Sequence, residues 1–297
     1  MKYGSAQAFE AALSAVLRRR TPSQTNAEFQ RLRRSVAFDR LLARLTRVDS
    51  DNWLLKGGVA LEYRMPAEAR ATTDIDLSAR GDVSIFVKSL TDATETDLGD
   101  YFEFVFTREP FRPVDDLPTT YRFSLEARLN ARRFERLTLD VGFADPWLGI
   151  AEQLSAPDLL SFAGIEPITV KAIPIAQHLA EKVHAYTREY GRQNTRVKDL
   201  VDIVLLSSHR PIDGTLLRVA FDGVFEARGT HGLPGALPVP PHGWAAPYGV
   251  LAEPLGIESN LSASHAMAAA FLDPVLARPQ NVQGLAWDPR SRTWGQL

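Results

Sequence analysis

The first 48 residues carry apolar positions at the three- and four-residue spacing of an amphipathic helix. Residues 6–20 (AQAFEAALSAVLRRR) show this spacing and end in three arginines. A second helix is predicted by a longer series with the same spacing: Phe29, Leu32, Val36, Phe38, Leu41, Leu42 and Leu45. Thr21 or Thr25 could cap its start, and Thr25 stands three residues before Glu28, as a capping box requires.

From about residue 50 the pattern changes to short runs that are typical of strands. These runs are 74–79 (DIDLSA), 101–107 (YFEFVFT), 121–129 (YRFSLEARL) and 136–143 (RLTLDVGF). Polar or proline-containing connections separate them, for example 108–118 (REPFRPVDDLP). The pattern predicts a mixed α/β core that contains several antiparallel or mixed strands.

The helical spacing returns after residue 174. Helices are predicted over 175–190, with Gly191 as a stop, and over 196–208, 215–229 and 258–276, while 285–297 is typical of a closing hairpin or tail. We therefore expect an α/β (α+β) protein with N-terminal helices over 1–48, a mixed-sheet core over 49–170 and a mainly helical C-terminal domain over 171–297.

The composition is that of a globular protein and excludes some chemistry. Of the 297 residues, 45% are hydrophobic and 24% charged, and the formal net charge is −2. The absence of cysteine excludes thiol nucleophiles, disulfides and cysteine-ligated zinc. The N-terminal residues lack the apolar core of a signal peptide, and no apolar run approaches membrane-spanning length. We expect a cytoplasmic protein without a membrane partner.

Arginine dominates the basic residues, with 28 arginines against six lysines. Because arginine makes bidentate contacts to phosphate, this bias favours phosphate or RNA partners, although codon usage in a GC-rich genome would also explain it. Candidates for an RNA-facing surface are Arg18, Arg19, Arg20, Arg31, Arg33, Arg34, Arg128, Arg132 and Arg133. For Arg31, Arg33 and Arg34 a solvated helix face is the simpler interpretation.

Two carboxylates stand one residue apart in the predicted strand 74–79. In a strand Asp74 and Asp76 point to the same face, with Ile75 and Leu77 turned into the core. A divalent cation such as Mg²⁺ between them would relieve their repulsion. Alternation in 136–143 places Asp140 on the face opposite the apolar residues, so it is the candidate third acid of a two-metal site for displacement at phosphorus.

A pair of glycines precedes the acidic pair. Gly57 and Gly58 follow an apolar run and Lys56, and a short helix is predicted to begin there. Glycines let backbone amides approach a phosphate closely. A triphosphate beside the metal would also need cations, and Lys56, Arg70 and Lys182 are the candidates.

The order of these motifs resembles a known family. The strings LKGGVALEYR, ARATTDIDL, AEKVHAY and RVKDLVDIVLL, spread over about residues 35–206, are similar to the AbiEii/AbiGii family of nucleotidyltransferase toxins, including its MenT-like branch, within the DNA polymerase beta-type superfamily. The resemblance implies a nucleotidyltransferase-fold core and Mg²⁺-dependent transfer of a nucleotide from an NTP, often a pyrimidine. It further implies the 3′ end of tRNA as acceptor, arrest of translation, and a cognate antitoxin as partner.

The resemblance also implies roles for individual residues. Asp74 and Asp76 match the metal-binding pair, and Asp140 stands where the third acid is expected. The nucleotide-binding candidates are Lys56, Gly57, Gly58, Arg70, Thr72 and Arg196. Thr72 lies where a hydroxyl residue precedes the acids, and Thr72 or Thr73 is a candidate site of phosphorylation by the antitoxin. Lys182 and Asp199 match two later motifs that toxicity requires.

The later motifs allow several physical roles. Lys182 could project from its helix toward the triphosphate, or be a lysine whose stem packs along the surface. Asp199 could hold Lys182 or Arg196, contact the sugar or base, or cap its helix. Arg196 could bind the γ-phosphate or the acceptor. No histidine spacing indicates a metal site, and His184 is interpreted as a packed histidine.

Two other functions fit the same motifs. The acceptor could be a protein hydroxyl, which would make the reaction AMPylation. Alternatively, the chain could be a non-catalytic member of the fold that binds RNA or an antitoxin, although the intact acidic pair, Lys182 and Asp199 argue against decay of the site.

Overall fold

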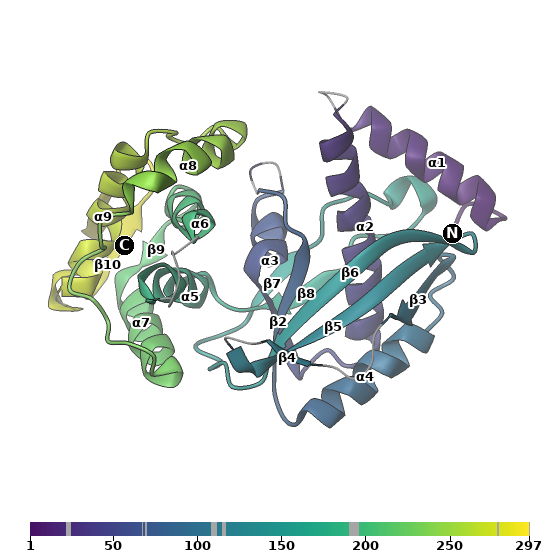
Figure 1. The fold of residues 1–297 in the computed structure, drawn as a ribbon, viewed down its shortest axis with the longest axis horizontal. Coiled ribbons are helices and arrows are strands. Elements are labelled where there is room, and N and C mark those ends of the chain that lie inside the picture. The colour runs from purple at the N-terminus through teal and green to yellow at the C-terminus, as the bar shows by residue number, and fades with distance from the viewer. Residues whose placement is uncertain are drawn as a thin grey trace. The chain divides into compact units, whose positions relative to one another are not determined.

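The computed structural model describes residues 1–21, 25–66, 68, 70–107, 112–114, 117–189, 196–277 and 279–296. The chain divides into two compact units (Figure 1). Unit 1 comprises Met1–Pro66, Ala71–Ala144 and Ala151–Ala172, and unit 2 comprises Ala67–Arg70, Asp145–Ile150 and Ile173–Leu297. Unit 1 contains the large sheet, and unit 2 contains the C-terminal helices.

Two helices open unit 1, as the apolar spacing predicts. Helix α1 spans Ala6–Arg19 and helix α2 spans Asn26–Val48. The hydroxyl of Thr25 accepts a hydrogen bond from the backbone N–H of Glu28 at 3.3 Å, so the predicted cap at Thr25 is confirmed. The apolar stripe of α1 is buried in the core of the unit.

Within the described residues, eight strands form one mixed sheet. Their bounds are β1 Trp53–Lys56, β2 Asp74–Ala79, β3 Phe102–Phe106, β4 Arg112–Val114, β5 Leu117–Leu129, β6 Arg132–Gly142, β7 Glu152–Ser155 and β8 Thr169–Ala172. The strand order is β3-β5-β6-β2-β1-β8-β7, with β4 paired to β5. Strand β2 is parallel to β6 and β1 is parallel to β8, while the other pairs are antiparallel. The predicted mixed α/β core is confirmed.

Several elements were not predicted from the pattern. Strands β1, β7 and β8 have four residues each, too few for alternation to be recognised. Strand β4 lies within the stretch expected to be a connection. Helix α4 (Val83–Glu95) was also missed, although Phe86, Leu90 and Ala93 bury one stripe of it. Helix α3 (Gly57–Arg64) begins at the glycine pair, as predicted.

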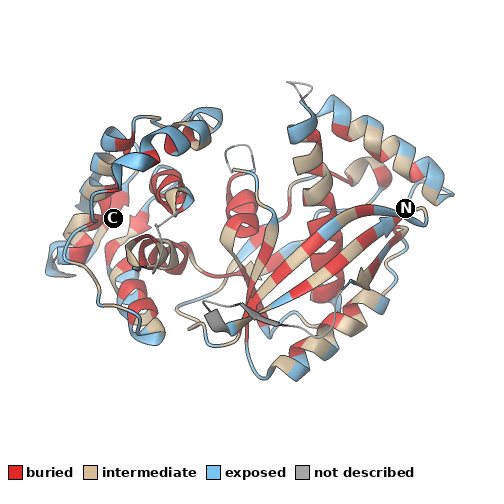
Figure 2. Cartoon of the chain, viewed as in Figure 1, coloured by how far each residue is buried: buried red, intermediate tan, exposed pale blue. Residues whose placement is uncertain are grey.

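One face of the sheet is buried, and the other is polar. Phe123 and Leu125 of β5 and Leu137, Leu139 and Val141 of β6 are buried, on the side that α2 contacts. Buried positions alternate with exposed and half-buried ones along both strands (Figure 2). The second face carries the polar side chains of β2, β5 and β6, and the acidic pair lies on it.

Unit 2 is mainly helical. Its helices are α5 (Ile175–Thr187), α6 (Val197–Ser207), α7 (Gly214–Arg228), α8 (Ala245–Ala252) and α9 (Leu261–Ala277). Strands β9 (Ile212–Asp213), β10 (Leu285–Asp288) and β11 (Thr293–Gln296) form a small sheet in the order β11-β10-β9. The antiparallel pair β10–β11 confirms the predicted closing hairpin. The predicted helix stop at Gly191 lies outside the described residues.

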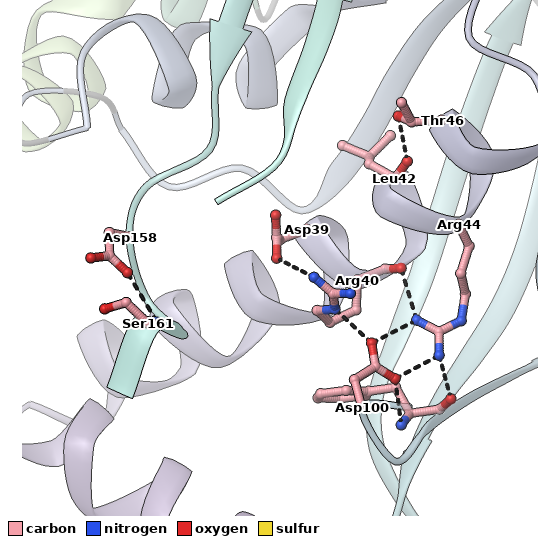
Figure 3. A network of polar contacts seen from close by, with 9 residues as sticks. Asp39, Arg40, Leu42, Arg44, Thr46, Asp100, Asp158 and Ser161 are labelled. Atoms are coloured by element: carbon pink, nitrogen blue, oxygen red, sulfur yellow. Dashed lines mark hydrogen bonds and ion pairs between the residues drawn. The ribbon is translucent and has the colours of Figure 1, made fainter. Parts of the chain in front are cut away.

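A network of buried charges ties α2 to the start of β3 (Figure 3). Arg44 is fully buried and donates to both oxygens of Asp100 at 2.6 and 2.9 Å, and Arg40 donates to Asp100 at 2.7 Å. Burial alone would raise the pKa of Asp100, but the two guanidinium groups outweigh it and lower that pKa. At Asp39 the charge of the neighbouring Arg40 does not outweigh burial, and burial raises the pKa of Asp39 to about 6.

Replacing Asp39 with asparagine is expected to stabilise the protein at neutral and higher pH but not in acid. The folded pKa of about 6 exceeds the reference value of 3.8, so the bound proton favours folding in acid, and this stability is lost as the pH rises through 6. Since asparagine mimics the protonated acid, the free energy of unfolding at about pH 8 should rise by about 1–3 kcal/mol.

Urea unfolding at about pH 4 and about pH 8 measures this difference. Asp92→Asn, at a more exposed carboxylate paired with Lys88, is the matched control and should show no such pH dependence. A stabilisation of the same size at both pH values would contradict the assignment to the Asp39 carboxyl group.

Candidate active site

Two glycines shape the turn between β1 and α3. Gly57 has a φ of +62°, in the left-handed region that favours glycine. A Cβ atom on Gly57 would lie 2.6 Å from Cγ of Asp76, and one on Gly58 would lie 2.6 Å from Cβ of Thr72. The glycines therefore let Asp76 and Thr72 approach the first turn of α3, where unpaired N–H groups can bind a phosphate.

The strand register brings the acidic positions together in unit 1. Strands β2 and β6 pair Asp76 with Asp140, and β1 and β2 pair Lys56 with Asp76. Residues paired across neighbouring strands share a face, so Lys56, Asp76 and Asp140 are adjacent on one face of the sheet. Asp74 shares this face because it lies two residues before Asp76, and the intervening Ile75 is fully buried.

Hydroxyl groups fix the segment that enters β2. The Thr73 hydroxyl donates to Oδ2 of Asp74 at 3.1 Å, and the Thr72 hydroxyl donates to the Asp74 carbonyl at 3.3 Å. From α2, Arg34 donates to the Thr72 carbonyl at 3.2 Å. Thr72 is half-buried against Gly58, whereas Thr73 is exposed.

Arg122 of β5, which the sequence interpretation missed, is part of this cluster. Its Nε and Nη2 donate to the two carboxylate oxygens of Asp140 at 2.7 and 2.6 Å. These hydrogen bonds raise the pKa of Arg122, and the charges of Asp74 and Asp76 raise it further. A guanidinium group therefore already neutralises part of the carboxylate cluster.

This arrangement corrects one expectation from the sequence. The repulsion between the acids was expected to require a divalent ion, but here Arg122 relieves part of it. Among the described residues, no group of three or more His, Asp or Glu side chains is placed to hold one metal ion. Asp140 shares the face of Asp74 and Asp76, but both of its oxygens bind Arg122.

The chain contains a signal that could have located Arg122. Strands β5 and β6 form a hairpin in which Asn130 and Ala131, between the strands, have φ values of +54° and +55°. The two-residue turn fixes which residues of β5 and β6 are paired, and it sets Arg122 opposite Asp140. The register shifts once, between Ala127 and Arg128. The turn was missed because its second residue is alanine, where glycine is the usual signal.

A second charged cluster lies in unit 2, where α5 meets α6. Lys182 Nζ donates to Asp199 at 3.0 Å and lies 2.8 Å from Oδ2 of Asp202. Arg70 donates through Nε and Nη2 to the two oxygens of Asp202, at 2.8 Å each. Lys182 and Arg70, which were expected to bind a triphosphate, are thus ion-paired within the protein. Several roles were considered for Asp199, and the structure shows one of them, the contact with Lys182.

Asp202 is the centre of this cluster, and no role was predicted for it. It is fully buried, and burial would raise its pKa, but the charges of Lys182 and Arg70 outweigh burial and lower that pKa. Burial likewise would lower the pKa of Lys182, and the two aspartates outweigh it and raise that pKa. Arg70, which donates two hydrogen bonds to Asp202, is far away in the sequence, so no local pattern could reveal that pair.

Arg196 and His184 are the two other residues of unit 2 that the sequence interpretation considered for the site. Arg196 is half-buried at the start of α6. His184 is buried, contacts Thr230 at 2.9 Å and packs on His231; burial lowers its pKa to about 3. The packed-histidine interpretation is therefore confirmed, and the ring is neutral at neutral pH.

Some of the arginines proposed to face RNA make contacts within the protein instead. Arg31 lies 3.6 Å from Glu62, Arg33 donates to a backbone carbonyl of β6, and Arg34 holds Thr72. The others in the proposed set (Arg18, Arg19, Arg20, Arg128, Arg132 and Arg133) are exposed, and three of them also make contacts within the protein: Arg18 with the Phe29 ring, Arg20 with the Asp158 carbonyl and Arg128 with Glu126.

The mixed sheet, with a glycine turn ahead of an acidic pair, is the arrangement that the resemblance to nucleotidyltransferase toxins implies. A sequence profile described as "Nucleotidyl transferase AbiEii toxin, Type IV TA system" matches residues 40–285. The chain therefore belongs to the AbiEii family, and it is a nucleotidyltransferase toxin of a type IV toxin–antitoxin system.

One solved structure of low sequence identity has the same fold, and a second was found at a lower score. MenT4, a nucleotidyltransferase toxin from Mycobacterium tuberculosis H37Rv, aligns with a TM-score of 0.51 and 22% identity, covering 70% of this chain and 68% of that one. JHP933 from Helicobacter pylori aligns with a TM-score of 0.49 and 11% identity, covering 82% and 93%. No curated protein sequence matches the chain. None of the described helices is long and apolar enough to cross a membrane.

Gly57→Ala is expected to lower the free energy of unfolding of unit 1 by about 1–3 kcal/mol, because the new Cβ meets the Asp76 carboxylate and the backbone is left-handed. Thermal unfolding measures the loss. Gly235→Ala is the matched control, since a Cβ there meets nothing within 4 Å. Equal melting temperatures for the two variants would show that the close approach of Asp76 is not maintained in solution.

Asp202→Asn is expected to destabilise unit 2 by about 3–5 kcal/mol, because it leaves two buried cations with one carboxylate. Adding Lys182→Met restores the charge balance and should recover part of the loss. Urea unfolding of the single and double variants tests this, with Asp222→Asn, at an exposed pair with Arg218, as control. A double variant less stable than the single one would contradict charge balance as the cause.

Proposed function

We propose that this toxin transfers a nucleotide, derived from a pyrimidine NTP, onto the 3′ end of tRNA with the help of Mg²⁺ and so blocks translation. The observation that carries the proposal is the register that aligns Lys56, Asp76 and Asp140 beside the glycine turn. It combines carboxylates for a metal ion with a lysine and backbone amides for phosphates. The sequence motifs that resemble the MenT-like branch support tRNA as the acceptor.

The residues on this face fit a magnesium ion. Mg²⁺ prefers oxygen ligands and is commonly bound by one or two carboxylates together with substrate phosphates. Asp74 and Asp76 are half-buried on one face, so water and phosphate oxygens can complete the coordination. When bound, the ion would polarise the phosphoryl oxygens and neutralise charge on the leaving group. Asp140 would become a further ligand of the ion once Arg122 no longer binds it.

In the proposed reaction the acceptor hydroxyl oxygen forms a bond to the α-phosphorus, and the bond from that phosphorus to the pyrophosphate oxygen breaks. Pyrophosphate leaves, and Asp140 takes the hydroxyl proton. Gly57, Gly58 and Lys56 would hold the triphosphate, and Thr72 would contact the nucleotide beside them. In unit 2 we assign nucleotide binding to Arg70 and Arg196.

Lys182 and Asp199 complete the proposed set. Lys182 would supply positive charge for the triphosphate. Asp199 positions Lys182 through the 3.0 Å contact, and its Oδ2 is buried with no hydrogen-bond partner among the described residues. That oxygen can accept a hydrogen bond from a substrate hydroxyl or a water molecule.

A cognate antitoxin is the proposed protein partner, and the cytoplasm is the proposed site of action. Thr73 is exposed and hydrogen-bonded to Asp74, and Thr72 lies against Gly58, so phosphorylation of either would add negative charge beside the acids. Such a group would repel the incoming triphosphate. We assign Thr72 or Thr73 as the hydroxyl through which the antitoxin acts.

The transfer assay incubates the protein with total RNA, Mg²⁺ and each of four labelled NTPs. A pyrimidine label should appear in tRNA, and Asp74→Asn with Asp76→Asn, Lys182→Ala, or Asp199→Asn should lower the rate by about two orders of magnitude or more. Glu126→Gln is the matched control, because it changes a carboxylate of the same sheet that pairs with Arg128.

The fate of the label separates the alternatives. Label that resists RNase but not protease would assign a protein acceptor and overturn the RNA proposal. No transfer with any NTP, or equal transfer by the Asp74→Asn, Asp76→Asn variant, would overturn catalysis at this site.

A further inference from the structure

One feature of unit 1 lies outside the residues that the proposed function assigns. Arg122 binds both oxygens of Asp140, the acid that would complete the metal site. The ion pair joins neighbouring strands at the paired positions of the β5–β6 hairpin, so a rigid backbone sets its geometry. While each of its oxygens accepts a hydrogen bond from the guanidinium, Asp140 has fewer lone pairs and less net negative charge to offer a metal ion.

The two sides of the ion pair differ in exposure. The side chain of Arg122 is 50% exposed, whereas that of Asp140 is 15% exposed. The guanidinium can therefore move from the carboxylate into solvent, since half of the Arg122 side chain is already exposed. The carboxylate, in contrast, is held on the sheet face next to Asp76 and cannot move away from its neighbour.

The charges around Arg122 favour an exchange of cations. Asp74 and Asp76 also attract its guanidinium group, so the charge of Arg122 interacts with all three carboxylates. A divalent ion on Asp74 and Asp76 would repel Arg122 and attract the Asp140 carboxylate. The two cations therefore compete for Asp140.

We propose that Arg122 is an internal counter-cation that holds Asp140 in the metal-free protein, yields it to the divalent ion, and then binds a substrate phosphate. This inference rests on the proposed function, because it takes Asp74, Asp76 and Asp140 as the metal ligands. The released guanidinium remains beside the acids, and its planar fork matches two phosphate oxygens. Arg122 thus couples metal binding to phosphate binding.

Mn²⁺ binding, followed through the electron paramagnetic resonance signal of the free ion, tests the exchange without reference to activity. Arg122→Gln should bind Mn²⁺ about threefold to tenfold more tightly than the wild type, because the competing cation is gone. Arg128→Gln is the matched control: Arg128 is on the same strand, 44% exposed, and pairs with Glu126 instead of the acids. It should leave the affinity unchanged.

Thermal unfolding provides a second measurement. Without metal, Arg122→Gln should melt at a lower temperature than the wild type, since the acids lose their counter-cation. Saturating Mn²⁺ should remove that difference. An equal difference with and without Mn²⁺ would overturn the exchange.

The experiment separates failure of the inference from failure of the proposed function. Mn²⁺ binding that survives Asp74→Asn with Asp76→Asn would overturn the metal site itself. Binding that those substitutions abolish, combined with wild-type affinity in Arg122→Gln, would overturn only the exchange.

The phosphate step is tested in the transfer assay. Arg122→Gln should raise the KM for the NTP or for the RNA, and the one that rises identifies the phosphate that Arg122 binds. Unchanged KM values for both would overturn this step.

Discussion

The repulsion between three carboxylates on neighbouring strands is the constraint on which the rest of this site depends. Neighbouring strands lie about 4.8 Å apart, and at such a separation two carboxylates repel by about 3 kcal/mol at an effective dielectric constant of about 20. The fold keeps Asp76 and Asp140 paired in register nevertheless. Lys56 lies opposite Asp76, Thr73 donates to Asp74, and Arg122 neutralises Asp140. The glycines contribute to the same arrangement, since a larger residue at Gly57 would displace Asp76 and one at Gly58 would displace Thr72.

Strand alternation was enough to predict which way the acids point, but not what lies beside them. The pattern of 74–79 and 136–143 sets Asp74, Asp76 and Asp140 opposite the apolar positions, and the structure confirms that orientation. Arg122 was missed because cross-strand neighbours depend on register. Register here depends on a two-residue turn without glycine and on a shift at Ala127. Strands β1, β7 and β8 were missed for a different reason, because four residues are too few for alternation to be recognised.

Contacts between residues that lie far apart in the chain are harder still to predict from the sequence. The guanidinium partner of Asp202 is Arg70, on a segment far away in the chain. Arginine content alone does not show which arginines face a partner. Arg40 and Arg44 are buried in the network around Asp100, and Arg33 and Arg34 donate to backbone carbonyl groups. Part of the arginine bias therefore serves the fold of unit 1, where a guanidinium group can satisfy several acceptors at once.

Charge balance and burial together distinguish the two charged clusters. In unit 2, Lys182 and Arg70 face Asp199 and Asp202, so two cations meet two carboxylates, and the cluster is buried and neutral as it stands. In unit 1, three carboxylates meet Lys56 and Arg122, which leaves an excess of negative charge on a face that water reaches. A buried cluster of side chains cannot hold such an excess of negative charge. A partly exposed cluster can hold it, and it then attracts a cation. The unbalanced cluster, more than the balanced one, is therefore where a bound cation would lower the energy of the protein.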